Sequence, residues 1–340
     1  MTVYNVTYRK EIKHENSEYV LHQILICIVQ IDESKYKRGF WQPNHKYNVI
    51  ERNDSMKEST ALILEGGSLR CLFTAGVMDT FIANGIEFPC VGGVSAGSLS
   101  GLNYVSKQMG RTAKVNIDYV KDKRFAGIHS LIRNRSIFNF DFLFDDIGKE
   151  LIPFDEETFY NSPQRFVAFS TDCKTGKLVS FEKGKTEDMM MACRSSCSMP
   201  LLSPIVHVDG MKCLDGGIAN PIPVEWAINE GYEKIVVVLT RHQEYRKPPV
   251  SKAMLRAYER TYKQYPRLIQ KLKQIPSHYN ELQETIDRLE KEGRIFVIRP
   301  EEPVLVSRVE KDVQKLRDLY EIGKIIANKR MEDMLAYLDE

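Results

Sequence analysis

Apolar and polar positions follow two different patterns between residue 56 and the end of the chain. Short runs rich in Val, Ile and Leu alternate with longer segments in which apolar residues recur every three or four positions. The first pattern is typical of buried strands, and the second of helices packed on one side. Strands are expected at 60–64, 90–94, 165–170, 178–182, 205–208, 234–240 and 295–298. Helices are expected at about 70–84, 97–109, 251–291 with breaks at Pro266 and Pro276, and 308–338 as a terminal pair.

Strands separated by helices predict an α/β fold, with a mostly parallel central sheet covered by helices on both faces. The main domain is expected at 56–340, with a basic helical insertion at 241–293 and a last strand and terminal helices at 294–340. Residues 1–55 hold alternating polar and apolar stretches, but not this succession of strands and helices. They are either a small strand-rich addition or an upstream N-terminal extension, and we favour the extension.

Composition narrows the class of protein. The chain has 340 residues, of which 43% are hydrophobic and 28% charged, enough to build a large core and too apolar for a disordered protein. Its 48 Lys and Arg nearly balance 46 Asp and Glu, which argues against a polycation built to bind nucleic acid. We therefore expect a globular protein of enzyme size, without a nucleic-acid partner.

Cysteine usage and hydropathy indicate the compartment. The seven cysteines are odd in number and include no C-x-x-C pair, so buried free thiols are favoured over a zinc or disulfide framework. The apolar run Tyr19–Ile31 is shorter than the roughly 20 residues that a membrane helix needs, and no basic leader is recognisable. We expect a cytoplasmic protein.

The sharpest chemical motif is G-x-S-x-G, formed by Gly93, Ser95 and Gly97 between a predicted strand and a predicted helix. A chain that reverses sharply from strand to helix has no room for side chains at the flanking positions. Such a turn presents the serine hydroxyl at a helix N-terminus, where developing negative charge is favoured. The context favours a nucleophile over a plain turn.

A second strand-to-helix turn contains Gly66, Gly67, Ser68 and Arg70. Its successive backbone N–H groups form either an oxyanion hole or a phosphate-binding loop, although neither nucleotide-binding glycine pattern is present. The remaining interpretation is a tight turn with an exposed Arg70.

A serine nucleophile needs a base, and two candidates remain. Asp215 lies in a loop with Gly216 and Gly217, which lets its carboxylate approach another backbone segment. Burial would have to raise its pKa, because an exposed aspartate is a poor base. The alternative is a Ser-His-Asp arrangement that uses His242; His278, the other histidine after Asp215, is expected to be solvated.

Residues 241–273 carry ten Lys and Arg against two Glu. Some of these cations follow helical spacing between Leu and Tyr residues, a pattern typical of helices on anionic lipid surfaces. A solvated face over a core stripe is the other interpretation, and we hold it slightly more strongly.

Taken in order, these motifs resemble the patatin-like phospholipase family, particularly its bacterial members. The family has a glycine-rich loop ending in a basic residue, then G-x-S-x-G, then D-G-[GA], and residues 195–200 look like its small-residue and proline segment. The likeness is strong over about 60–240, and the helical remainder also looks like the bacterial branch.

The resemblance implies a three-layer αβα fold and hydrolysis of fatty-acyl esters, of phospholipid or a related lipid, through an acyl-enzyme. Ser95 would be the nucleophile and Asp215 the base, without histidine. Gly66, Gly67 and Ser68 would supply oxyanion N–H groups, and Arg70 would support that loop or meet an anionic head group. The resemblance implies no metal and no cofactor.

Two residues depart from the family pattern, in which the loop usually reads G-G-G-x-[KR]-G. Ser68 and Cys71 replace the third and last glycines. If position 68 requires a positive φ, a serine there costs on the order of 1 kcal/mol. A side chain at Cys71 would hinder the closest helix–sheet packing. A catalytically weak or silent lipid-binding protein therefore stays an alternative.

Overall fold

The computed structural model describes residues 57–340, so the expected extension at 1–55 lies outside the described residues. An eight-stranded sheet forms the centre, in the order β5-β6-β3-β2-β1-β7-β8, with β4 also paired to β3. Its strands are β1 Thr60–Leu64, β2 Cys90–Val94, β3 Arg165–Asp172, β4 Leu178–Glu182, β5 Val206–Val208, β6 Met211–Asp215, β7 Lys234–Val238 and β8 Phe296–Ile298.

The five strands from β3 to β8 along this order run parallel, whereas β4, β5 and β6 pair in antiparallel fashion. The expected α/β fold with a mostly parallel sheet is thus confirmed. The strand β6 was not predicted, because the turn residues after Asp215 concealed it. Asp215 is therefore the last residue of a strand instead of a loop residue.

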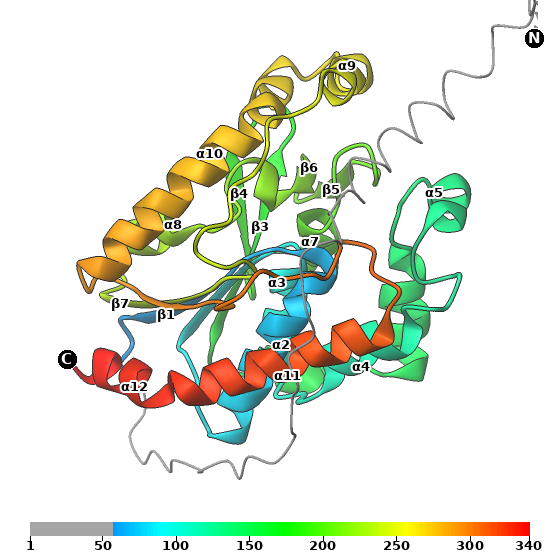
Figure 1. Cartoon of the computed structure of the whole chain (residues 1–340). Coiled ribbons are helices and arrows are strands. Elements are labelled where there is room, and N and C mark those ends of the chain that lie inside the picture. The colour runs from blue at the N-terminus through cyan, green and yellow to red at the C-terminus, as the bar shows by residue number, and fades with distance from the viewer. Residues whose placement is uncertain (1–56) are drawn as a thin grey trace, which may run out of the picture.

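Helices cover both faces of the sheet (Figure 1). They include α2 Leu72–Ala83, α3 Ala96–Val105, α7 Met189–Ser196, α9 Lys252–Thr261, α10 Pro266–Lys291, α11 Val313–Lys329 and α12 Met331–Asp339. Other elements are the 3₁₀ turns Ser68–Cys71 and Gly216–Ile218, α4 Arg111–Tyr119, α5 Ile128–Asn134, a π-helix at Phe142–Leu151, α6 Glu156–Asn161 and α8 Val224–Asn229.

Two expected helix boundaries differ from the structure. The expected helix 70–84 begins with a 3₁₀ turn that includes Arg70, and the regular helix starts only at Leu72. Pro266 opens α10 at a first-turn position, where its missing N–H costs nothing. Pro276 lies inside α10 and does not end it, because the buried apolar face of the helix holds it together across the proline.

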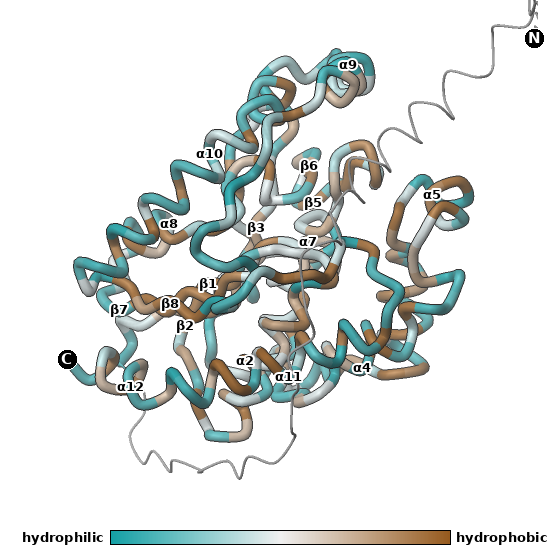
Figure 2. The backbone as a smooth tube through the Cα atoms, in the orientation of Figure 1, coloured by the Kyte–Doolittle hydropathy of each residue, from teal (hydrophilic) through white to brown (hydrophobic). Residues whose placement is uncertain are grey.

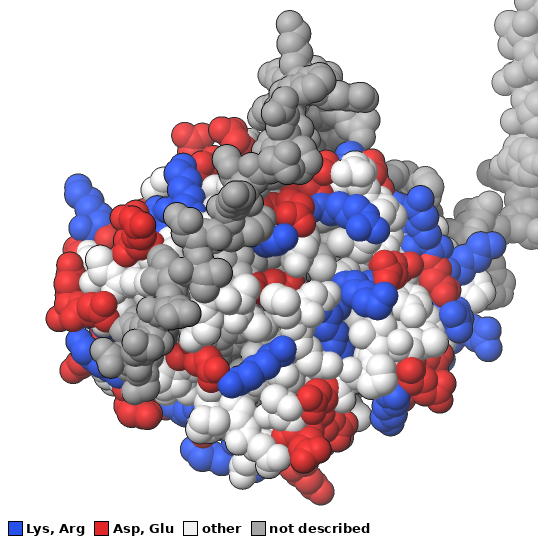
Figure 3. All heavy atoms as spheres, turned by 90° about the horizontal axis from the view of Figure 1, so that it is seen from below, with Lys and Arg blue, Asp and Glu red and all other residues white. Residues whose placement is uncertain are grey.

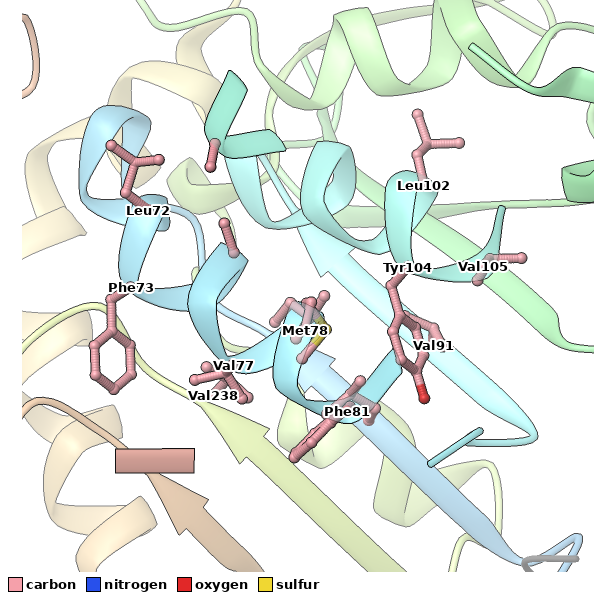
Figure 4. Packing of buried hydrophobic residues seen from close by; sticks show 14 of the residues in the cluster. Leu72, Phe73, Val77, Met78, Phe81, Val91, Leu102, Tyr104, Val105 and Val238 are labelled. Carbon is pink, nitrogen blue, oxygen red and sulfur yellow. The ribbon is translucent and has the colours of Figure 1, made fainter. Parts of the chain in front are cut away.

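Residues of β1 alternate between two cores, as the two-residue period of a strand requires. Leu62 and Leu64 pack with α2, α3 and α11 on one face. Ala61 and Ile63 pack with α8 and α10 on the other. The hydrophobic band through β1, β2, β7 and β8 is visible in Figure 2, and Figure 4 shows α2 and α3 packed together on the sheet. These three layers place the carboxyl ends of β1, β2 and β7 beside one another.

No helix within 57–340 is both long and apolar enough to cross a bilayer. On the face in Figure 3, basic and acidic side chains are interspersed. All six cysteines in the described part of the chain are buried free thiols, as expected, and Cys27 lies outside it.

Candidate active site

Ser95 occupies a strained turn between β2 and α3. Its backbone has φ 54° and ψ −130°, a conformation that L-residues avoid. The flanking glycines are required by space: a Cβ on Gly93 would lie 2.6 Å from the Ser98 backbone, and one on Gly97 would lie 2.5 Å from the Leu64 carbonyl oxygen. The turn predicted from the G-x-S-x-G motif is therefore present, with Ser95 at the N-terminus of α3.

Neighbouring serines hold this turn in place. The Ser95 N–H donates to Ser196 Oγ at 2.7 Å, and Ser196 Oγ in turn donates to the Phe169 carbonyl on β3. The Ser95 carbonyl accepts from the Ser98 N–H and hydroxyl. These bonds offset a backbone strain of about 1–3 kcal/mol. Ser196 belongs to the small-residue segment seen in the sequence, but nothing in the sequence indicated its contact with Ser95.

Asp215 and Ser95 line one common cavity. The two residues lie on opposite sides of β3, and the pairing of Asp215 with Ser170 sets the approach. The Gly217 N–H donates to Asp215 Oδ1 at 2.8 Å, and Thr171 Oγ1 donates to the Asp215 carbonyl at 2.8 Å. Burial raises the pKa of Asp215, opposed by a hydrogen bond from Ser95 and by the Gly217 N–H. A buried carboxylate beside a serine hydroxyl is suited to accept its proton.

The glycine loop lies against the nucleophile. A Cβ on Gly66 would be 2.8 Å from Ser95 Cβ, so only glycine permits this approach. Within residues 57–340, no backbone hydrogen bond has the N–H of Gly66, Gly67 or Ser68 as its donor. The Gly67 N–H faces the Cys71 thiol, whereas those of Gly66 and Ser68 have no hydrogen-bond partner among the described residues. Ser68 has a positive φ of 50°, so its backbone carries the strain of about 1 kcal/mol expected for a serine in that conformation.

Arg70 and Cys71 are both interior residues. Arg70 is 8% exposed, and the interpretation of an exposed arginine at this turn is wrong. The Cys71 thiol donates to the Glu65 carbonyl at 3.5 Å, so its side chain fills space next to the turn. Burial raises the pKa of Cys71 to about 12, which keeps the thiol neutral.

A buried carboxylate that we did not predict fixes the glycine loop to the rest of the fold. Glu65 Oε2 accepts from the Thr240 N–H at 2.6 Å and from its hydroxyl at 3.0 Å. Glu65 Oε1 accepts from Tyr279 Oη at 3.1 Å. These bonds join the end of β1 to the segment after β7 and to α10. No spacing in the sequence links the three residues, which is why this anchor could not be predicted.

Two cavities meet at Ser95. One, of about 430 Å³, extends over α3 and is lined mainly by apolar side chains, among them Leu72, Leu99, Val115, Phe138 and Phe144. The other, of about 190 Å³, lies on the Asp215 side and is lined by Arg70, Arg241, Lys247 and Arg308 among others. Ser68, Ser95 and Met199 line both.

The histidines lie away from this centre. His242 stacks near Tyr245 and lines neither of the two cavities. His278 was expected to be solvated, but it is half-buried on α10, and its Nε2 has no hydrogen-bond partner among the described residues. Burial lowers the pKa of His278. In the described residues, neither histidine hydrogen-bonds Ser95 or Asp215.

Comparisons with known proteins agree with the geometry. A family model described as patatin-like phospholipase matches residues 62–228, and a domain of unknown function, DUF6363, matches residues 265–339. The second match includes α10, β8, α11 and α12, which complete the sheet and its two helical layers.

Relatives and a solved structure are also similar to this chain. The uncharacterized protein YjjU of Escherichia coli K12 is 26% identical over 272 residues, which cover 78% of this chain and 75% of that protein. A patatin-like phospholipase domain-containing protein of Caenorhabditis elegans, ZK370.4, is 26% identical over 228 residues, 61% of this chain but only 15% of that protein. The structure of VipD from Legionella pneumophila aligns with 92% of this chain and 72% of its own, at 12% identity and a TM-score of 0.43. Residues 62–228 of the chain are thus a patatin-like phospholipase domain.

Proposed function

We propose that this protein is a serine acyl hydrolase that cleaves fatty-acyl esters, of phospholipid or a related lipid, through a Ser95–Asp215 dyad. The observation that carries the proposal is the buried carboxyl of Asp215, which lines the same cavity as Ser95 on its strained turn. A plain structural turn would not need that strain. The patatin-like phospholipase domain at residues 62–228 also supports ester hydrolysis.

The dyad would work in two steps. Ser95 Oγ attacks the ester carbonyl carbon while Asp215 takes the hydroxyl proton, and the N–H groups of Gly66, Gly67 and Ser68 bind the oxyanion. The C–O bond to the alcohol breaks, and Asp215 returns the proton to the leaving oxygen. Water then attacks the acyl-enzyme carbonyl carbon while Asp215 takes a proton from it. The bond to Ser95 Oγ breaks, Asp215 returns the proton to Oγ, and the fatty acid leaves. None of these steps requires a metal or a cofactor.

Labelling with a fluorophosphonate probe tests this proposal, because the probe reacts with a serine activated by a base and an oxyanion hole. We expect a single labelled peptide that contains Ser95. The alternative, a silent lipid-binding protein, is motivated by Ser68 at φ 50° in the oxyanion loop. Folded protein that binds lipid but remains unlabelled would favour that alternative.

The large cavity is proposed to hold the acyl chain. Leu99 is half-buried one turn beyond Ser95 and lines this cavity. Leu99→Trp should lower kcat/KM for long-chain esters at least about tenfold relative to a butyryl ester, because the indole occupies the space for the chain. The matched change Leu335→Trp, at a half-buried leucine of α12, should leave the ratio unaltered. A chain-length preference unchanged in L99W would contradict this assignment.

We also propose peripheral contact with anionic membranes through 241–273, in a protein of the cytoplasm. Arg256 and Arg260 are exposed on α9, whereas Tyr258 and Tyr262 are buried beneath them. The helix therefore has the cationic outer face that such contact needs, although the same arrangement suits a solvated face.

Vesicle sedimentation distinguishes membrane contact through α9 from a merely solvated helix face. Arg256→Glu with Arg260→Glu should weaken binding to anionic vesicles at least about tenfold, since each cation near the surface contributes about 1 kcal/mol. Reversing the exposed Lys177 and Arg317 together should have a smaller effect. Equal loss in both double variants would contradict a specific role for α9.

A further inference from the structure

The small cavity beside Asp215 concentrates positive charge. Arg70 follows β1, Arg241 and Lys247 follow β7, and Arg308 precedes α11, so separate segments bring their cations to one place. Only two carboxylates line the same cavity, Glu65 and Asp215. Glu65 already accepts three hydrogen bonds, from Thr240 and Tyr279, and Asp215 accepts one from the Gly217 N–H. The cavity therefore carries a net excess of cations.

Arg70 gives the clearest indication of an anion-binding site. It is 8% exposed, and its Nε is buried without a hydrogen-bond partner in the described part of the chain. A buried charge is costly unless it is paired and hydrogen-bonded. Burial and then repulsion from Arg241 and Arg308 lower the pKa of Arg70. Burial and then repulsion from Arg308 lower the pKa of Lys247 to about 7. An anion bound in the cavity would offset the burial and the mutual repulsion of Arg70 and Lys247.

The place of the cavity says which part of a substrate would enter it. The apolar cavity and the cationic cavity share Ser95, whose hydroxyl is the proposed nucleophile. An ester bound with its acyl chain in the first cavity directs its alcohol portion into the second. Arginine and lysine together are the side chains that most often bind phosphate oxygens.

We propose that Arg70, Arg241, Lys247 and Arg308 form a subsite for a phosphate monoester on the alcohol portion of the substrate. The inference rests on the proposed acyl hydrolase activity. It predicts that the protein prefers acyl esters with an anionic phosphate to zwitterionic or neutral ones.

The aromatic residues of the cavity argue against a choline-type head group. Three tyrosines line the cavity and could receive a quaternary ammonium by cation–π contact, Tyr245, Tyr258 and Tyr279, and two of them already face a cation. Arg241 already lies 4.2 Å from the Tyr245 ring centroid, and Lys247 lies 4.0 Å from that of Tyr279. A second cation would meet these charges instead of free ring faces.

The test compares lysophosphatidate, lysophosphatidylcholine and monoacylglycerol with one common acyl chain. We expect the full chain to prefer lysophosphatidate in kcat/KM, and Arg308→Gln to lower the lysophosphatidate-to-monoacylglycerol ratio about tenfold, the value of one charge-assisted hydrogen bond. Arg308 is exposed, so its replacement should not disturb folding. The control Arg317→Gln changes an exposed arginine of α11 outside the cavity and should keep the wild-type ratio.

A binding measurement separates this inference from the proposed function. Calorimetric titration with glycerol phosphate should show binding to the wild type and weaker binding to R308Q. Hydrolysis of all three lipids at similar rates, without glycerol phosphate binding, would overturn the subsite and leave the hydrolase. Glycerol phosphate binding in a protein that hydrolyses no ester would keep the subsite and overturn the hydrolase. Binding without any lysophosphatidate preference would contradict a lipid head group and indicate a soluble phosphate ester.

Discussion

Ser95→Ala should lower the rate of ester hydrolysis by about 10⁴-fold or more, because no acyl-enzyme can form without the hydroxyl. The fold should be unaffected, since the Ser95 N–H and carbonyl, not its hydroxyl, hold the turn through Ser196 and Ser98. The measurement is turnover of a soluble acyl ester together with fluorophosphonate labelling, and both should disappear.

A matched control keeps this result interpretable. Ser180 is an exposed serine on β4, and Ser180→Ala should hydrolyse the ester at the wild-type rate. Circular dichroism melts of both variants should coincide with that of the wild type. Residual turnover in S95A within about tenfold of the wild type would exclude Ser95 as nucleophile.

Asp215→Asn should reduce kcat by about 10³–10⁴-fold, because the amide keeps the shape of the carboxyl but cannot accept the serine proton. The asparagine oxygen can still accept the Gly217 N–H that bonds Asp215 Oδ1 at 2.8 Å, so the loop should keep its conformation. Asp209→Asn makes the same change at an exposed residue between β5 and β6, and it should be fully active. Near-normal turnover in D215N would disprove the dyad.

The pH dependence of ester hydrolysis follows from the carboxyl group of Asp215. Burial raises the pKa of Asp215 above its ordinary value, and the base must be ionised to act. The acid limb of the kcat/KM profile should therefore have its midpoint above about 3.9 and should vanish in the residual activity of D215N.

Ionisation of Asp215 should enable hydrolysis but lower the folding stability. The folded state holds the Asp215 proton more tightly than the unfolded chain, so this group favours folding at pH values below about 3.9 and loses that contribution as the pH rises through the raised value. At neutral pH the ionised, buried carboxyl opposes folding. D215N should consequently melt at the same temperature as the wild type or higher, as measured by thermal unfolding at pH 7.

Local features of the fold were predictable because neighbours in sequence decide them. The strands at 60–64 and 90–94 match β1 and β2, since buried parallel strands are continuous apolar runs bounded by turns. The antiparallel β6 was missed because turn residues follow Asp215 directly and Lys212 interrupts the apolar pattern of the strand. The domain boundaries at 241–293 and 294–340 stay predictions, although β8 pairs with β7 inside the same sheet.

The candidate site was predicted in its parts but not in its assembly. The turns at Gly66 and Ser95 could be recognised because each is a strand-to-helix reversal with glycines where side chains would clash. The approach of Asp215 to Ser95 was supported only by the family resemblance. The anchor of Glu65 on Tyr279 joins residues 214 positions apart, and no local pattern encodes it.

The sequence by itself determined the alternation of strands and helices, the strained serine turn and the glycine loop, because backbone sterics and hydrophobic period act over a few residues. Tertiary structure alone decided that Arg70 is buried, that His242 lies outside the site, and that four cations share one cavity with Asp215. These features depend on the order of strands in the sheet and on which helices cover its edge. Contacts of that kind form between distant segments, and their energies are set only once the chain has packed.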